Sequence, residues 1–477
     1  MPTINNQELK QAENLKNNWK FKEALYLLDN FEKKQDLTTY ERFQLYFLKA
    51  SILIDLLASK QALNYADLAY NESIQLGSDY HIISVLVLKS HIFASLLETS
   101  NQLEVITEAE EILAKNNQKS SQEFKLMKGH VLLCKGYYNF NIGNLNQCLR
   151  LFGEASQLAN EINDKKLIIL TIKWLSITYG IKGEIDRALE YKKRYLALAI
   201  ELNDIQEIIG AHNTLGMQFT EKGEFKEATE HLEKALSLCY KISSWKTFIV
   251  SDSLFYAYLK SNYLEKAQQL YDRMGELVKQ GTYKFNEQAY RLQEAALLKR
   301  NIHETSRSKA EKIYKEVADK DTTFIESKID ALVNLCDLYL TRLKETSNLK
   351  ELDKIKPYID KIRSIAEKNG VYSLLAEMHL FQAKLKLVSF EFKEAQGLLD
   401  RALDVALIHG LNLIVRRVKD EQTELSKNFL KWEKLKVLGG KISERMDLAR
   451  VDEQIKLLLQ KRTYLKKITD QALSVIK

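Results

Sequence analysis

The side chains of this sequence that could carry out chemistry are spread singly along it. Eight histidines and four cysteines are present, and none form the close groups from which metal sites are built. They are His81, His91, His130, His212, His231, His303, His379, His409, Cys134, Cys148, Cys239 and Cys336. A protein metal site needs three or four ligands that converge, often from paired Cys or His spacings. We therefore predict no metal and no other cofactor, and we expect the cysteines to be buried, reduced thiols.

Other catalytic signatures are missing as well. Gly439-Gly440-Lys441 lacks the upstream glycine and the following serine or threonine of a phosphate-binding loop. No serine, cysteine or aspartate stands in the strand–turn–helix setting of a nucleophile elbow. The sequence therefore predicts a protein that binds a partner and is not an enzyme.

The elements that would position a binding site recur along the chain with a regular period. The clearest unit reads Leu215-Gly216-x-x-Phe219-x-x-x-Gly223-x-Phe225-x-x-Ala228-x-x-x-Leu232-x-x-Ala235-Leu236. A residue that is usually small opens the second helix of each unit, and we call it the anchor. From the sequence the anchors are Ala24, Ala62, Ile106, Cys148, Ala188, Ala228, Ala267, Ala310, Ile359 and Ala395. A larger side chain four residues later and a small one after three more share a helix face, which predicts stacked helix pairs.

The turns of the repeat also recur. Gly143, Gly183 and Gly223 each lie five residues before an anchor, and glycine suits the left-handed end of a helix. Asn163-Asp164 and Asn203-Asp204 are one period apart, and the aspartates can cap the helices that follow. Proline occurs only twice in 477 residues, which favours an all-α chain.

This pattern resembles the tetratricopeptide repeat (TPR) over residues 7–410, in about ten units. The long period, roughly 40 residues, and the missing inter-repeat proline resemble the long-repeat subgroup that includes kinesin light chain, Rap and MalT-type domains. The resemblance implies a right-handed α-solenoid of about ten helix pairs in residues 1–410. Residues 411–477 are then expected to form a basic segment of amphipathic C-terminal helices.

The same resemblance implies a binding groove along the first helix of each pair. The family's groove positions fall here on His130, Tyr137, Lys173, Asn213, Met217, Asp252 and Tyr256. Asn213 stands where related repeats use an asparagine to hold a ligand's backbone amide, because one carboxamide both donates and accepts. Tyr137 and Tyr256 would add flat apolar contacts. A protein or peptide partner is therefore expected in this groove.

The C-terminal segment carries the charge imbalance of the chain. Residues 411–477 hold 16 Lys and Arg against 9 Asp and Glu, which equals the formal net charge of +7. After Gly439-Gly440, with Ser443 as the expected N-cap, an apolar stripe runs through Leu448, Val451, Ile455, Leu458 and Leu465. Its length of about three heptads is short for a coiled coil. The stripe either caps the solenoid or forms a homodimer or partner contact.

Three functions remain open from the sequence. The first is a non-catalytic scaffold or adaptor that binds a peptide or partner helix in the groove. The second is a peptide- or ligand-sensing regulator of the Rap or MalT type. The third is a nucleic-acid or membrane-surface role of the basic tail, which the few tail aromatics disfavour for nucleic acid. The polar N-terminus and the lack of a long apolar run predict a cytoplasmic chain without a membrane span.

Overall fold

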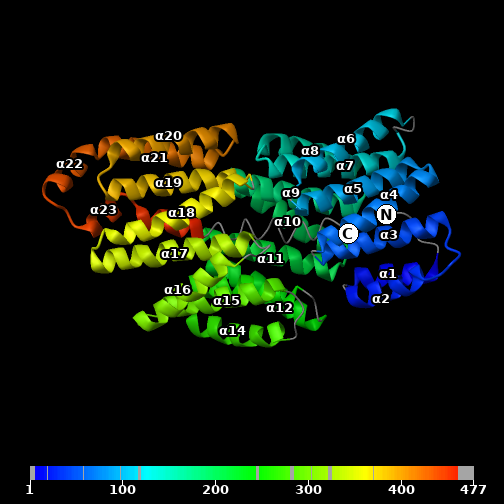
Figure 1. Cartoon of the computed structure of the whole chain (residues 1–477), viewed down its shortest axis with the longest axis horizontal. Helices are drawn as coiled ribbons and strands as arrows, with labels where there is room; N and C mark the ends of the chain where they lie inside the picture. Colours follow the sequence, from blue (N-terminus) through cyan, green and yellow to red (C-terminus); the bar gives the residue numbers. More distant parts are fainter. Residues whose placement is uncertain are drawn as a thin grey trace. The chain divides into compact units, whose positions relative to one another are not determined.

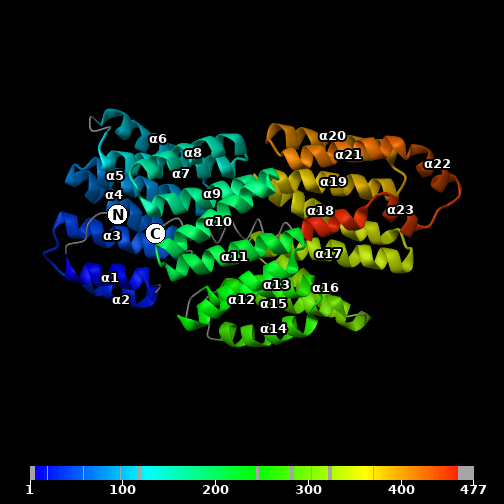
Figure 2. The same cartoon turned by 180° about the vertical axis from the view of Figure 1, so that it is seen from behind.

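A computed structural model describes residues 6–459, apart from 19, 57, 97, 117–119, 243–245, 280–283, 302, 321–324 and 369. Within these residues the chain is built from α-helices without strands (Figures 1 and 2). Helices α1 to α8 and α11 to α20 pack as successive pairs, and α9 and α10 continue the alternation along the chain, so the predicted all-α fold of repeated helix pairs is confirmed. Among the described residues, none of the helices is long and apolar enough to cross a membrane.

The chain divides into two compact units, and the division between Thr178 and Tyr179 falls inside α9. The first unit contains α1 (Gln7–Asn17), α2 (Phe21–Glu32), α3 (Thr39–Asp55), α4 (Ser59–Leu76), α5 (Asp79–Leu96), α6 (Thr99–Lys115), α7 (Gln122–Asn141), α8 (Leu145–Glu161) and most of α9 (Lys165–Lys182). The predicted domain boundary at residue 410 stays a prediction.

The second unit continues the same alternation of first and second helices. It contains α10 (Ile185–Glu201), α11 (Ile205–Lys222), α12 (Phe225–Lys241), α13 (Thr247–Lys260), α14 (Leu264–Lys279), α15 (Lys284–Arg300), α16 (Glu304–Asp319), α17 (Ile325–Thr346), α18 (Lys350–Lys368), α19 (Tyr372–Val388), α20 (Phe392–Ile408), α21 (Asn412–Lys427), α22 (Phe429–Val437) and α23 (Ile442–Leu448). The chain is helical again over 451–459.

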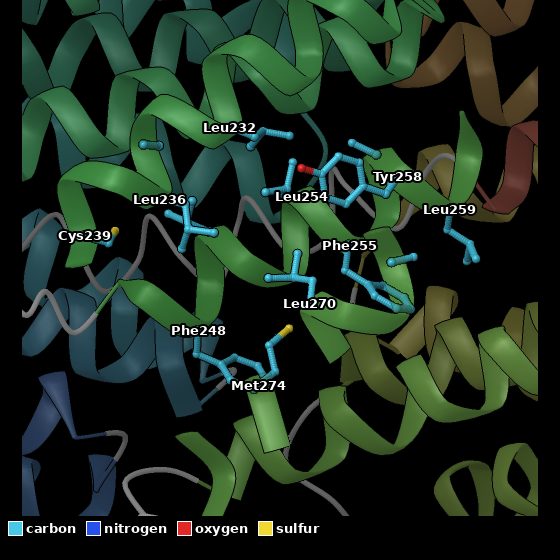
Figure 3. Close-up of a cluster of buried hydrophobic side chains, with 14 of the residues drawn as sticks. Leu232, Leu236, Cys239, Phe248, Leu254, Phe255, Tyr258, Leu259, Leu270 and Met274 are labelled. Carbon is cyan, nitrogen blue, oxygen red and sulfur yellow. The ribbon is translucent and has the colours of Figure 1, made fainter. Parts of the chain in front are cut away.

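The second helices are held by one buried stripe. In α12 the anchor Ala228 is followed by Leu232, Ala235 and Cys239 at steps of four, three and four, and all four are fully buried. These steps keep the side chains on one face of the helix. Figure 3 shows Leu232, Leu236 and Cys239 of α12 in one apolar cluster with side chains of α13 and α14.

Two of the anchors predicted from the sequence are wrong by one helical turn. The buried pattern with steps of four, three and four starts at Gln102 in α6 and at Ile355 in α18, each four residues before the predicted Ile106 and Ile359. Gln102 is fully buried although it is polar. Because anchors are expected to be small or apolar, the pattern indicated Ile106, the next apolar residue on the same face.

The predicted turns are confirmed. Gly143, Gly183 and Gly223 have φ of 77°, 82° and 78°, the left-handed region in which glycine carries no Cβ penalty. Asp164 Oδ1 accepts from the backbone N–H of Leu167 at 2.8 Å, and Asp204 makes the equivalent cap. These turns fix where each first helix begins and ends, and therefore which of its side chains face its neighbours.

Gly216 allows α11 and α12 to approach closely, and this predicts a measurable effect. A Cβ there would lie 2.4 Å from Leu232 Cγ and 3.0 Å from the backbone oxygen of Ala228. We expect Gly216→Ala to lower the unfolding midpoint, because overpacking costs about 1–3 kcal/mol. Gly397 of α20 is the matched control, since its Cβ would meet nothing within 4 Å. Gly397→Ala should raise the midpoint, because alanine stabilises a helix interior by about 1 kcal/mol relative to glycine. Thermal unfolding followed by circular dichroism measures both, and equal effects would contradict the tight contact.

Candidate functional site

A cleft of about 440 Å³ opens between four first helices of the first unit. Its volume falls in the range of sites that hold small ligands or single peptide side chains. Its walls come from α3, α5, α7 and the start of α9. The lining residues are Phe47, Tyr80, Ile83, Ser84, Val87, Leu88, His91, Leu126, Met127, His130, Asp164, Lys166 and Leu170.

The cleft follows the repeat. We compare the residues that lie 18 and 11 positions before each anchor, with the anchors of α6 and α18 corrected as above, and call them the first and second inner positions. In the third repeat they are Ser84 and His91, before Gln102, and in the fourth His130 and Tyr137, before Cys148. Ser84, His91, His130 and Leu170, the first inner residue of the fifth repeat, all line the cleft. Equivalent positions of successive repeats therefore build one surface.

The two cleft histidines are half-buried and favour their neutral forms. Loss of hydration, with a smaller effect of the neighbouring His130, lowers the pKa of His91 to about 4. Loss of hydration also lowers the pKa of His130 to about 4, against the attraction of the Asp164 carboxylate. A neutral imidazole has one donor and one acceptor nitrogen. At neutral pH the two imidazoles therefore offer hydrogen-bonding groups without charge. The other lining residues are mostly apolar, and Asp164 and Lys166 add one charge of each sign.

Cys134 and His91 form a thiol–imidazole contact, but not a reactive one. The distance from Cys134 Sγ to His91 Nε2 is 3.7 Å, and Cys134 is buried. Burial raises the pKa of the Cys134 thiol to about 12, while that of His91 is lowered. A nucleophilic cysteine needs the opposite arrangement, with a thiolate stabilised beside a cation. Across the described ranges, no three His, Cys, Asp or Glu side chains form a group that could hold a metal ion.

The three predicted groove residues of the first unit have different surroundings. His130 lines the cleft. Tyr137 is buried, and its ring centroid lies 4.7 Å from that of Trp174 and 6.4 Å from that of His91. Lys173 on α9 is buried too. Tyr137 thus supports the wall that carries His91, and the role of all three in binding stays a prediction.

The four predicted residues of the second unit lie on α11 and α13. Asn213 and Met217 are buried and touch, with Asn213 Nδ2 3.6 Å from Met217 Sδ. Asn213 Oδ1 has no hydrogen-bond partner within the described residues. Asp252 is buried and accepts from Gln293 of α15, and Tyr256 is half-buried with its ring 5.0 Å from that of Phe255. A groove function for these four also stays a prediction.

Sequence reasoning missed Tyr80, Ser84 and His91 in the cleft wall formed by α5. The signal was present, because Ser84 and His91 precede Gln102 by the same two intervals by which His130 and Tyr137 precede Cys148. The prediction named no groove residue on α5, and its anchor at Ile106 would place the equivalent positions one helical turn further along this helix. Because Gln102 is not a small residue, the repeat pattern did not lead from it to the cleft residues of α5.

The paired helices, the recurrent buried stripe and the glycine turns define the chain as a TPR-like helical-repeat protein. No protein-family description matches the sequence, and no curated protein sequence does. Solved structures match its fold. A Rap protein complexed with competence and sporulation factor has a TM-score of 0.51 and 14% identity, over 76% of this chain and 98% of that one.

Two further matches are weaker. The first, a signal transduction ATPase from Pyrococcus horikoshii with a tetratricopeptide repeat sensor, has a TM-score of 0.45 and 14% identity, over 62% and 43% of the two chains. Aspartyl phosphate phosphatase F from Bacillus subtilis has a TM-score of 0.40 and 10% identity, over 86% and 97%. In fold, the chain therefore resembles the Rap protein of the first match.

Proposed function

We propose that this chain is a peptide-binding helical-repeat regulator of the cytoplasm, which acts without catalysis. The observation that carries the proposal is the cleft between α3, α5, α7 and α9, where equivalent positions of successive repeats converge. The fold likeness to a Rap protein that was solved with a bound factor supports a regulator over a passive scaffold. An adaptor that binds a partner's peptide in the same cleft is the alternative.

The chemistry of the cleft suits one apolar side chain of a peptide and the backbone around it. Val87, Leu88 and Leu170 line the cleft with apolar side chains. His91 and His130 can each donate to a peptide carbonyl and accept from a peptide N–H in their neutral forms. The mixture of one carboxylate and one ammonium in the lining matches a peptide that carries both charges. It does not match a phosphate, which would call for several basic groups.

The test begins with a displayed library of random eight-residue peptides, selected on the intact protein. Enriched peptides are then synthesised with a fluorophore, and their affinity is measured by anisotropy for wild type and two variants. We expect His130→Ala to weaken binding at least about tenfold, the loss of one well-made buried hydrogen bond. Lys128→Ala is the control, because Lys128 lies on the same helix with its side chain exposed. Equal affinities for both variants and wild type would place the binding site elsewhere.

A second readout separates regulator from adaptor. A regulator of this class transmits binding through its repeat stack, so the selected peptide should change the dimensions of the protein in small-angle scattering. An adaptor needs only a stable groove, so its dimensions should stay constant when the peptide is bound. The His130→Ala protein at the same peptide concentration provides the reference without ligand.

A further inference from the structure

The C-terminal segment of the described chain, residues 442–459, lies on the first helices of the second unit. Its helix α23 packs against α17 and α19, as both views in Figures 1 and 2 show. Five of its larger apolar side chains are buried, namely Ile442, Met446, Val451, Ile455 and Leu458. Of the predicted stripe, Val451, Ile455 and Leu458 are therefore covered within the chain, Leu448 is half-buried, and Leu465 falls outside the described residues.

The local structure of the segment differs from the prediction in two respects. Helix α23 begins at Ile442, so Ser443 lies in its first turn and is not its N-cap. The single predicted helix is interrupted at Arg450, whose φ is 51°. Two short helices then follow the surface of the first helices.

The centre of this contact is a glutamine on a buried carboxylate. Gln454 Nε2 donates to Glu377 Oε2 at 2.7 Å, and Gln454 Oε1 accepts from Arg417 Nη2 at 2.8 Å. The Arg417 guanidinium also donates to Glu377 Oε1 at 2.6 Å. Glu377 is 0% exposed and Gln454 is 1% exposed. One carboxamide thus bonds both members of an ion pair whose glutamate is buried and whose arginine is half-buried.

Two lysines provide further polar contacts to the segment. Lys384 Nζ, buried on α19, donates to the backbone oxygen of Ala449 at 2.9 Å and to Glu421 Oε1 at 2.6 Å. Lys344 of α17 pairs with Asp452. The segment is therefore recognised by its backbone, by its glutamine and by one acidic side chain.

These contacts fall on the inner positions of the repeat. Glu377 and Lys384 are the first and second inner positions before the anchor Ala395, and Lys344 is the second inner position before the corrected anchor Ile355. His130 and Tyr137 hold the same two positions in the fourth repeat. The last two repeats thus use their inner positions to hold a helical segment of the same chain.

A simple cap does not account for this arrangement. Repeat arrays need a terminal element over the last apolar face, and α21 already packs on α20. The 442–459 segment instead returns across α17 and α19, and Gln454 reaches a glutamate 77 residues earlier in the chain. Gly439, with φ of 64°, precedes the segment in the connection from α22.

We propose that the inner face of α17, α19 and α21 is a binding site for an amphipathic helix that carries a glutamine in its apolar stripe. Residues 442–459 occupy this site in cis and can exchange with a helix of the same pattern. The proposal concerns a different unit from the cleft of α3, α5, α7 and α9, and it does not depend on the function proposed for that cleft.

The experiment uses the full chain with a protease site inserted between Gly439 and Gly440, cut after folding. The probe is a fluorescent peptide of residues 441–459. We expect the cut protein to take up the peptide, and the uncut protein to bind it about a hundredfold more weakly. The uncut segment competes at the millimolar effective concentration of a short tether. A peptide with Gln454→Ala should bind at least about tenfold more weakly, while Lys456→Ala, at an exposed position, should not change the affinity.

Two controls decide against the proposal if they fail. The cut protein could retain its own segment and take up no peptide, or it could lose its helical signal on cleavage. Either result would show that the segment is a permanent part of the fold. An uncut Gln454→Ala chain should bind the wild-type peptide more tightly than uncut wild type, because its own segment competes less well. No gain there would also overturn the exchange. His130→Ala should leave every result unchanged, which separates this site from the cleft of the first unit.

Discussion

Acidification from pH 7.5 to pH 4.5 is expected to lower the unfolding midpoint steeply, because the fold keeps several histidines neutral. Loss of hydration lowers the pKa of His91, His130, His212 and His379 to about 4 in each case. An unfolded histidine binds a proton below about pH 6.5. Between pH 6.5 and pH 4 the unfolded chain therefore gains protons that the native chain does not, and the native state loses stability as the pH falls.

The size of the effect follows from burial. His212 and His379 are 4% and 6% exposed, so solvent screens their environment little. A tenfold change in an acidity constant corresponds to about 1.4 kcal/mol, so each should cost on the order of 2–3 kcal/mol by pH 4. The half-buried His91 and His130 should contribute less. Above pH 6.5 none of the four contributes, so the midpoint should be level there.

The measurement compares thermal unfolding of wild type and His379→Leu at pH 7.5, 5.5 and 4.5. His379 is further disfavoured as a cation by Arg363 and Arg401. The leucine variant should therefore lose less stability than wild type between pH 6.5 and 4.5, and the exposed His303→Leu should lose as much as wild type. Against the effect of burial, hydrogen bonds from Lys315, Tyr339 and Arg342 lower the pKa of Glu311 from 4.5 to about 2, so its contribution is lost mostly below pH 4.5. A parallel loss in wild type and His379→Leu would contradict the histidine account.

Local regularities were predictable from the sequence, and contacts distant in sequence were not. Helix pairs, glycine turns and aspartate caps depend on residues within one repeat, so spacing alone predicts them. Gln102 as an anchor could not be predicted from residue type, because a buried polar side chain breaks the rule that identifies anchors. That single shift hid Ser84 and His91.

The C-terminal segment exposes a different limit. Its apolar stripe was evident from spacing. Gln454, as a polar residue, would be expected at the surface, and only the fold shows that it is buried against Glu377. No local pattern relates residues 77 positions apart. The sequence therefore left capping and dimerisation open, and in the structure residues 442–459 contact the inner positions of the last repeats.

Two ion pairs of equal length allow the energetic role of this buried contact to be measured. The Arg417–Glu377 and Lys386–Glu394 pairs both have an N–O distance of 2.6 Å. The glutamate of the first pair is 0% exposed and that of the second is 61% exposed. Burial is the largest difference between the two glutamates, and Glu377 also accepts a hydrogen bond from Gln454.

We expect Glu377→Ala to lower the free energy of unfolding by about 3 kcal/mol, since it removes the carboxylate from the half-buried Arg417 guanidinium and the acceptor from the buried Gln454 amide. Gln454 would also lose its acceptor, so the 442–459 segment should loosen together with the fold. Glu394→Ala should cost less than about 1 kcal/mol, as exposed pairs do. Urea unfolding of both variants gives the two values. Similar losses would mean that water reaches Glu377 and that its contacts contribute little to holding the segment.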